Sequence, residues 1–62
     1  MPVDKRNDHA ADWCEAIRET GVGLTSWEME FVESLDRQLS RGNLLSIKQL
    51  DTLENIYTEK TP

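Results

Sequence analysis

The sequence has few of the residues that carry catalytic and metal chemistry. It contains one cysteine, Cys14, and one histidine, His9, among 62 residues. One cysteine cannot close a disulfide within the chain, and one cysteine with one histidine falls short of the four ligands of a structural zinc site. No nucleophile or carboxylate can be assigned to His9 as a catalytic partner, so we expect a surface histidine. The sequence therefore predicts neither an enzyme nor a bound metal or cofactor.

Long apolar runs are missing as well. No stretch approaches the roughly 20 apolar residues of a membrane span. The opening residues, MPVDKRNDHA, lack the apolar core of a signal peptide. The sequence accordingly predicts a cytoplasmic protein without membrane contact. A chain this short forms one domain at most, and a single small core seldom contributes more than roughly 3–5 kcal/mol of net stability.

Basic residues are outnumbered. Twelve acidic residues against seven basic ones give a formal charge of −5. Such a surface repels phosphate backbones, so direct binding to nucleic acid is disfavoured. The chain is nevertheless 37% hydrophobic with two tryptophans, which is too apolar for a wholly disordered protein. It should fold.

Two similar stretches, LTSWEMEF and LLSIKQL, predict helix starts. Thr25 with Glu28, and Ser46 with Gln49, have the spacing of a capping box, in which each side chain of the pair bonds the backbone N–H of the other residue. The apolar pairs that can close a hydrophobic staple around the two caps are Leu24 with Met29 and Leu45 with Leu50. The same helix-start solution is therefore used twice.

Two glycines predict where the preceding helices end. Gly21 follows AIRET and Gly42 follows RQLSR, the usual place for a left-handed residue after a helix. Together with the caps, they predict three helices, at about 8–20, 25–41 and 46–59.

The short link after Gly42 makes the second and third helices antiparallel neighbours. The predicted fold class is all-α: a three-helix mini-domain, residues 1–62, in which the second and third helices form a firm antiparallel hairpin and the first lies across it. We expect residues 1–7 and 60–62 to be frayed.

Each predicted helix has an apolar face at the 100° helical increment. The members are Ala10, Trp13, Cys14 and Ile17 in the first helix, Trp27, Phe31, Val32, Leu35 and Leu39 in the second, and Leu50, Leu53, Ile56 and Tyr57 in the third. Cys14 is expected to be buried. Both tryptophans lie on these faces, which favours the core, although tryptophan is also enriched among binding anchors.

Three apolar residues lie outside these faces or at their edges. Trp27 is at the edge of its face, and Met29 and Ile47 lie outside theirs. Ile47 together with Trp27 or Met29 could begin a contact patch for a partner, or be covered by a second copy of the chain. Single exposed apolar residues are also common and need no partner.

Acidic residues occupy the opposite faces of the first two helices. The candidates for binding a protein with a basic surface patch are Glu30, Glu33 and Asp36, with Asp12, Glu15 and Glu19 behind them. A merely solvated face is the alternative for each of them. The acid pairs Glu30–Glu33 and Asp51–Glu54 lack the glycine-containing, oxygen-rich loop of a calcium site, so no metal is assigned to them.

One pattern resembles a known group of proteins. The motif W-E-x-x-F from Trp27 to Phe31, followed by R-G-x-x-L-S-x-K-Q from Arg41 to Gln49, is similar to a helical-hairpin segment in short uncharacterised reading frames of tailed bacteriophages and prophages. Similar segments occur in some phage DNA-metabolism proteins. The resemblance covers about residues 24–57 and implies a phage setting inside a bacterial host cell. It brings no catalytic residues with it.

The leading hypothesis is a small acidic phage-type accessory protein that binds and modulates, for instance inhibits, a host or phage protein. One alternative is a DNA-transaction accessory protein that touches nucleic acid directly, for which the support is Lys5 with Arg6 and Arg37 with Arg41. Another is a structural homodimer, which would relieve the shortage of core in so short a chain.

Overall fold

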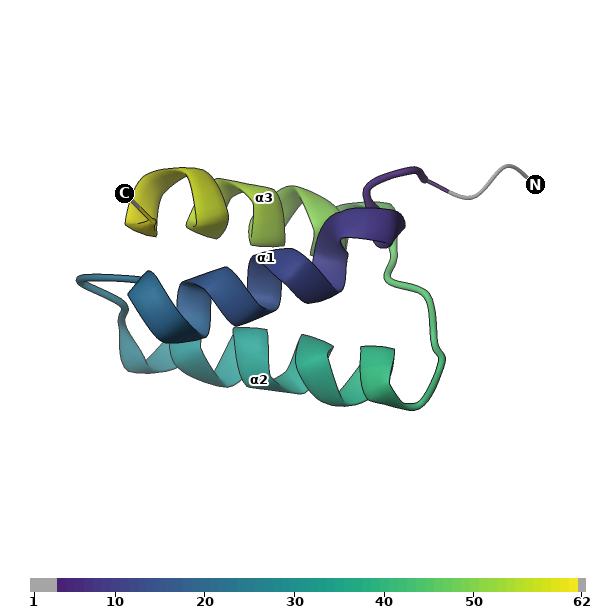
Figure 1. Ribbon diagram of the computed structural model, residues 1–62, viewed down its shortest axis with the longest axis horizontal. Coiled ribbons are helices and arrows are strands. Elements are labelled where there is room, and N and C mark those ends of the chain that lie inside the picture. The colour runs from purple at the N-terminus through teal and green to yellow at the C-terminus, as the bar shows by residue number, and fades with distance from the viewer. Residues whose placement is uncertain (1–3, 62) are drawn as a thin grey trace.

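The computed structural model describes residues 4–61, which form three helices and no strand. They are α1 (Asn7–Thr20), α2 (Ser26–Ser40) and α3 (Ile47–Lys60) (Figure 1). The predicted all-α, three-helix fold is confirmed, and every helix begins and ends within one residue of its predicted bound. In the part of the chain described here, no helix is long and apolar enough to cross a membrane.

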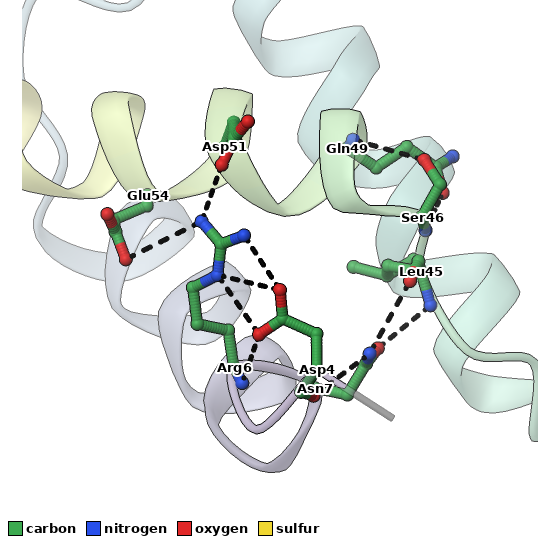
Figure 2. Close-up of polar contacts among 8 residues, drawn as sticks. All are labelled: Asp4, Arg6, Asn7, Leu45, Ser46, Gln49, Asp51 and Glu54. Carbon is green, nitrogen blue, oxygen red and sulfur yellow. Dashed lines mark hydrogen bonds and ion pairs between the residues drawn. The ribbon is translucent and has the colours of Figure 1, made fainter. Parts of the chain in front are cut away.

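Both predicted capping boxes are present. At the start of α2, the Thr25 hydroxyl accepts from the Glu28 backbone N–H at 3.1 Å, and the Glu28 carboxylate accepts from the Thr25 N–H at 2.9 Å. At the start of α3, Ser46 and Gln49 make the same two bonds at 3.2 and 2.9 Å (Figure 2). The backbone N–H of Thr25 lowers the pKa of the Glu28 carboxyl, because it stabilises the charged form. Each box satisfies two backbone donors that a helix start otherwise leaves open.

Removal of the α3 cap should destabilise the protein. Ser46→Ala is expected to lower the free energy of unfolding by about 1 kcal/mol, since the Gln49 N–H loses its acceptor. Thr25→Ala should cost a similar amount. Thermal unfolding followed by circular dichroism measures both. Ser26→Ala is the control, because Ser26 is exposed and takes no part in either box; if it lowers the melting temperature as much as Ser46→Ala does, the caps are not the cause.

The two glycines differ from one another. Gly42 is left-handed at φ +82°, as predicted. Gly21 is not: its backbone is extended, with φ −65° and ψ 138°, so the predicted left-handed end of α1 is wrong. The left-handed turn is made two residues later, by Gly23 at φ +70°. Glycine is instead required at position 21 because the backbone there lies close to the end of α1. A Cβ would lie 2.4 Å from the carbonyl oxygen of Ile17.

The first helix holds the other two together. Figure 1 shows α1 between α2 and α3, with α2 and α3 running in opposite directions on either side of it. α1 packs extensively against both neighbours, whereas α2 and α3 barely touch each other. The predicted close hairpin of α2 and α3 is therefore not confirmed. The link 41–46 carries the chain past the start of α1 instead of turning it back against α2.

The core lies along α1. Of the described residues, the buried apolar ones are Ala10, Cys14 and Ile17 from α1, Val32 and Leu35 from α2, Leu45 from the link, and Leu50, Leu53 and Ile56 from α3. The predicted burial of Cys14 is confirmed. Burial raises the pKa of its thiol to about 11, and the charge of Asp36 adds to the rise. Cys14 is therefore a core residue rather than a reactive thiol.

Residues at the start of α1 and just before it are tied to the start of α3 and to the link that precedes it (Figure 2). The Arg6 guanidinium pairs with Asp4 at 2.8 Å and with Asp51 of α3 at 2.7 Å. Asn7 accepts from the Leu45 backbone N–H at 2.8 Å and donates to the Leu45 carbonyl at 3.4 Å. Residues 4–7 of the segment predicted to be frayed thus hold two helix starts together. Residues 1–3 and 62, also predicted to be frayed, lie outside the described residues.

Candidate functional site

A groove with two adjoining hollows lies between α1 and α2, and Arg18 borders both hollows. We call it the α1–α2 groove. One hollow, called the apolar hollow below, has a volume of about 420 Å³ and is lined by apolar side chains together with Arg18 and Glu33. The other has a volume of about 540 Å³ and is mainly polar.

The apolar hollow is built where α1 ends and α2 begins. Its walls are Ile17 and Gly21 from the end of α1, Leu24 from the link, and Met29 and Val32 from α2. Ile17 and Val32 are core residues whose edges reach the groove, and Met29 is 50% exposed. Leu24 and Met29 are the predicted staple pair, and both line this hollow.

The polar hollow carries charges from both helices. Glu15, Arg18 and Glu19 come from α1, and Asp36 comes from α2. The Arg18 guanidinium meets the Asp36 carboxylate at 2.9 Å. Both side chains are substantially exposed, and such pairs contribute only about 0–1 kcal/mol to stability.

The groove as a whole is acidic. Glu33 lies at the edge of the apolar hollow, and Glu15, Glu19 and Asp36 border the polar one. These four carboxylates against the one guanidinium of Arg18 leave a formal local charge of −3. An acidic rim beside an apolar floor suits a ligand that is both basic and apolar.

The structure brings together four of the six predicted acidic residues. Glu15, Glu19, Glu33 and Asp36 border the groove. Asp12 and Glu30 are exposed but are not part of its lining. Sequence reasoning missed Arg18, although it is the only lysine or arginine in α1 and stands between two of the predicted acids, Glu15 and Glu19.

The two tryptophans have different environments. Trp13 is half-buried and stacks on Tyr57 of α3, with ring centroids 5.6 Å apart. Trp27 is 60% exposed and stacks on Phe31 of its own helix at 5.2 Å. The sequence favoured the core for Trp27 over a binding surface, and that preference is wrong. At the helical increment, Trp27 lies on the same side of α2 as Gln38, whose side chain accepts a hydrogen bond from Gln49 of α3. The sparse contact between α2 and α3 leaves this side of α2 uncovered.

The three predicted apolar contact residues do not form one patch. Trp27 and Met29 are in the first turn of α2, whereas Ile47 opens α3, and these two helix starts lie at opposite ends of the bundle (Figure 1). All three side chains are exposed, Ile47 at 65%. Met29 alone borders the groove. The antiparallel course of α2 and α3 thus separates Ile47 from the other two.

The described residues contain no group of three His, Cys, Asp or Glu side chains placed to hold a metal ion. His9 is exposed and stacks beside Trp13 at 6.2 Å between ring centroids. Comparisons of the chain with protein-family models, with curated proteins and with solved structures found no match.

Proposed function

We propose that this chain is a small, non-catalytic accessory protein that binds a basic surface of another protein through the α1–α2 groove and so modulates that protein. The observation that carries the proposal is the convergence of Glu15, Glu19, Glu33 and Asp36, from two helices, on one groove with an apolar floor. The phage-like motif of α2 and α3 suggests that the partner is a host or phage protein in a bacterial cell.

Charge at such a site acts mainly on association. A concentrated negative potential steers a basic partner into encounter and raises the on-rate, and added salt weakens this effect. Affinity then needs apolar contact as well, because exposed ion pairs contribute little by themselves. The α1–α2 groove provides both the negative charge and the apolar contact. A protein bound through it can cover the functional region of its partner.

Direct binding to nucleic acid is the second candidate, and the contacts of Arg6 weigh against it. Its guanidinium is shared between Asp4 and Asp51, so the Lys5–Arg6 pair offers little free positive charge to a phosphate. Arg37 and Arg41 are exposed at the end of α2. Two exposed cations on a chain of net charge −5 make a weak phosphate site.

A structural homodimer is the third candidate, and the exposed stack of Trp27 on Phe31 is the feature that favours it. Burial of this pair against a second copy would add apolar contact that the short chain lacks. Sedimentation over a hundredfold concentration range detects such an association.

Charge reversal on the groove should abolish partner capture. We expect the double variant Glu15→Lys/Glu33→Lys, immobilised and incubated with a bacterial lysate, to lose the basic proteins that the parent retains at low salt. Both side chains are exposed, so the substitutions should cost little stability. Mass spectrometry identifies the captured proteins, and repetition at high salt should weaken capture by the parent in the same way.

The matched control is Glu30→Lys/Glu59→Lys, on α2 and α3. It changes the formal charge by the same amount, from −5 to −1, with exposed residues outside the groove. It should retain the partner. Equal loss in the two double variants would mean that net charge, not the groove, governs binding. Capture of nucleic acid in place of protein by the parent at physiological salt would contradict the proposed function.

A further inference from the structure

We infer that the occupant of the α1–α2 groove is a basic amphipathic helix of the partner, which inserts an apolar side chain beside Met29 and places basic side chains against the carboxylates of the polar hollow. This inference rests on the proposed function and specifies the kind of segment that is bound. It follows from three properties of the groove: its apolar floor, the spacing of its two hollows, and its charge.

The apolar hollow can receive an aliphatic side chain. Ile17, Leu24 and Val32 provide branched apolar walls, and Met29 stands half-exposed at the border. A methionine side chain is unbranched and adapts its shape to a ligand, which is why methionines are common on surfaces that bind helices. Covering the hollow with a leucine-sized side chain would remove this apolar area from water.

The spacing of the hollows favours a helical ligand. Arg18 borders both hollows. On α1 the apolar hollow involves Ile17, and the polar one involves Ala11, Glu15 and Glu19; on α2 the apolar hollow involves Met29 and Val32, and the polar one involves Asp36. At a rise of about 1.5 Å per residue, the lining residues of the two hollows are therefore offset by roughly one helical turn along each helix. Residues four apart on a bound helix have this separation on one face. An extended segment would instead need a strand edge to pair with, and the described residues contain no strand.

The negative charge of the groove determines which class of ligand it can bind. A local charge of −3 repels anionic phosphates, which excludes a duplex or an anionic lipid surface as the natural ligand of this groove. A second copy of this chain carries a charge of −5 and is repelled as well. Lysine or arginine side chains of a helix would face Glu15, Glu19 and Asp36 while the apolar anchor occupies the neighbouring hollow. A basic amphipathic helix therefore matches both the apolar hollow and the polar hollow.

The test uses a synthetic peptide of alanine, leucine and lysine with blocked ends, in which leucine and lysine are four residues apart along one face. A second peptide of identical composition places leucine and lysine on opposite faces. Calorimetry measures affinity for the 62-residue chain, and amide shifts locate the site. We expect the same-face peptide to bind about tenfold more tightly and to shift the resonances of groove residues. Similar affinity for the two peptides would overturn the inference.

Substitutions that leave the net charge unchanged test the apolar contact separately from the charge. Met29→Gln should weaken binding of the same-face peptide about fivefold, because half of this apolar side chain remains to be covered. Ile47→Gln changes an exposed apolar residue in the first turn of another helix, at the far end of the bundle, and should change affinity less than twofold. An unchanged affinity in Met29→Gln would overturn the helical anchor.

The two proposals fail differently. If lysate capture depends on Glu15 and Glu33 but the same-face peptide does not bind better than its rearranged form, the groove binds a basic surface of another shape, and only the inference of a helix is overturned. If capture is insensitive to these glutamates, the proposed function fails as well. Displacement of the bound peptide by duplex DNA would also overturn the inference, because it would identify nucleic acid as a ligand of the acidic groove.

Discussion

Replacement of Ile17 by alanine is expected to lower the free energy of unfolding by about 2–5 kcal/mol. Ile17 is 1% exposed and belongs to the helix that packs against both of the others. The change removes apolar contacts and leaves a cavity that the surrounding helices fill only in part. Since a domain of this size has roughly 3–5 kcal/mol of net stability, much of the variant should be unfolded. Urea unfolding followed by circular dichroism measures the loss.

Ile47→Ala provides the matched control for this core substitution. It removes the same atoms from the same residue type, but Ile47 is 65% exposed in the first turn of α3. We expect a change within about 0.5 kcal/mol. If the two alanine variants have equal stability, α1 does not hold the core together as the structure indicates.

Asn7→Ala should have the next largest effect, a loss of about 1–3 kcal/mol. The Asn7 side chain accepts from the Leu45 N–H at 2.8 Å and donates to the Leu45 carbonyl at 3.4 Å. Leu45 is buried, so alanine at position 7 would leave a backbone donor without its partner in a poorly hydrated place. The melting temperature and urea midpoint of the variant should both fall.

Asn7→Asp tests which of the two bonds matters. A carboxylate keeps the acceptor for the Leu45 N–H but cannot donate to the Leu45 carbonyl. The acidic group is also favourable at the start of α1, because of the helix dipole. We expect the aspartate variant to lie between the parent and alanine in stability. An aspartate variant no more stable than alanine would show that the shorter bond does not carry the effect.

Local signals in the sequence were sufficient to place the helices. A capping box involves side chains and backbone groups only three residues apart, so Thr25–Glu28 and Ser46–Gln49 can be recognised without knowledge of the rest of the fold. Gly42 is a similar local signal. The prediction for Gly21 was wrong because position 21 requires glycine for a different reason. The nearby carbonyl oxygen of Ile17 leaves no room for a Cβ, and the backbone makes no left-handed turn there.

The pairing of the helices could not be predicted in the same way. Apolar periodicity shows which face of a helix is covered, but not which neighbour covers it. Trp27 illustrates the difference, since its place depends on how little α2 and α3 touch. The groove likewise depends on α1 packing beside α2. The acidic residues of the groove could be predicted as charged faces of single helices. The contact of Arg18 with Asp36 could not, because it joins residues 18 positions apart.

The placement of α1 between its neighbours has a consequence for the folding pathway. Contacts of α1 with α2 close a short connection. The contacts around the starts of α1 and α3 instead join distant residues, Asn7 with Leu45, 38 positions apart, and Arg6 with Asp51, 45 apart. Longer loops cost more entropy to close. Because α3 has little contact with α2, its neighbour along the chain, we expect α3 to complete the core only after α1 and α2 have paired.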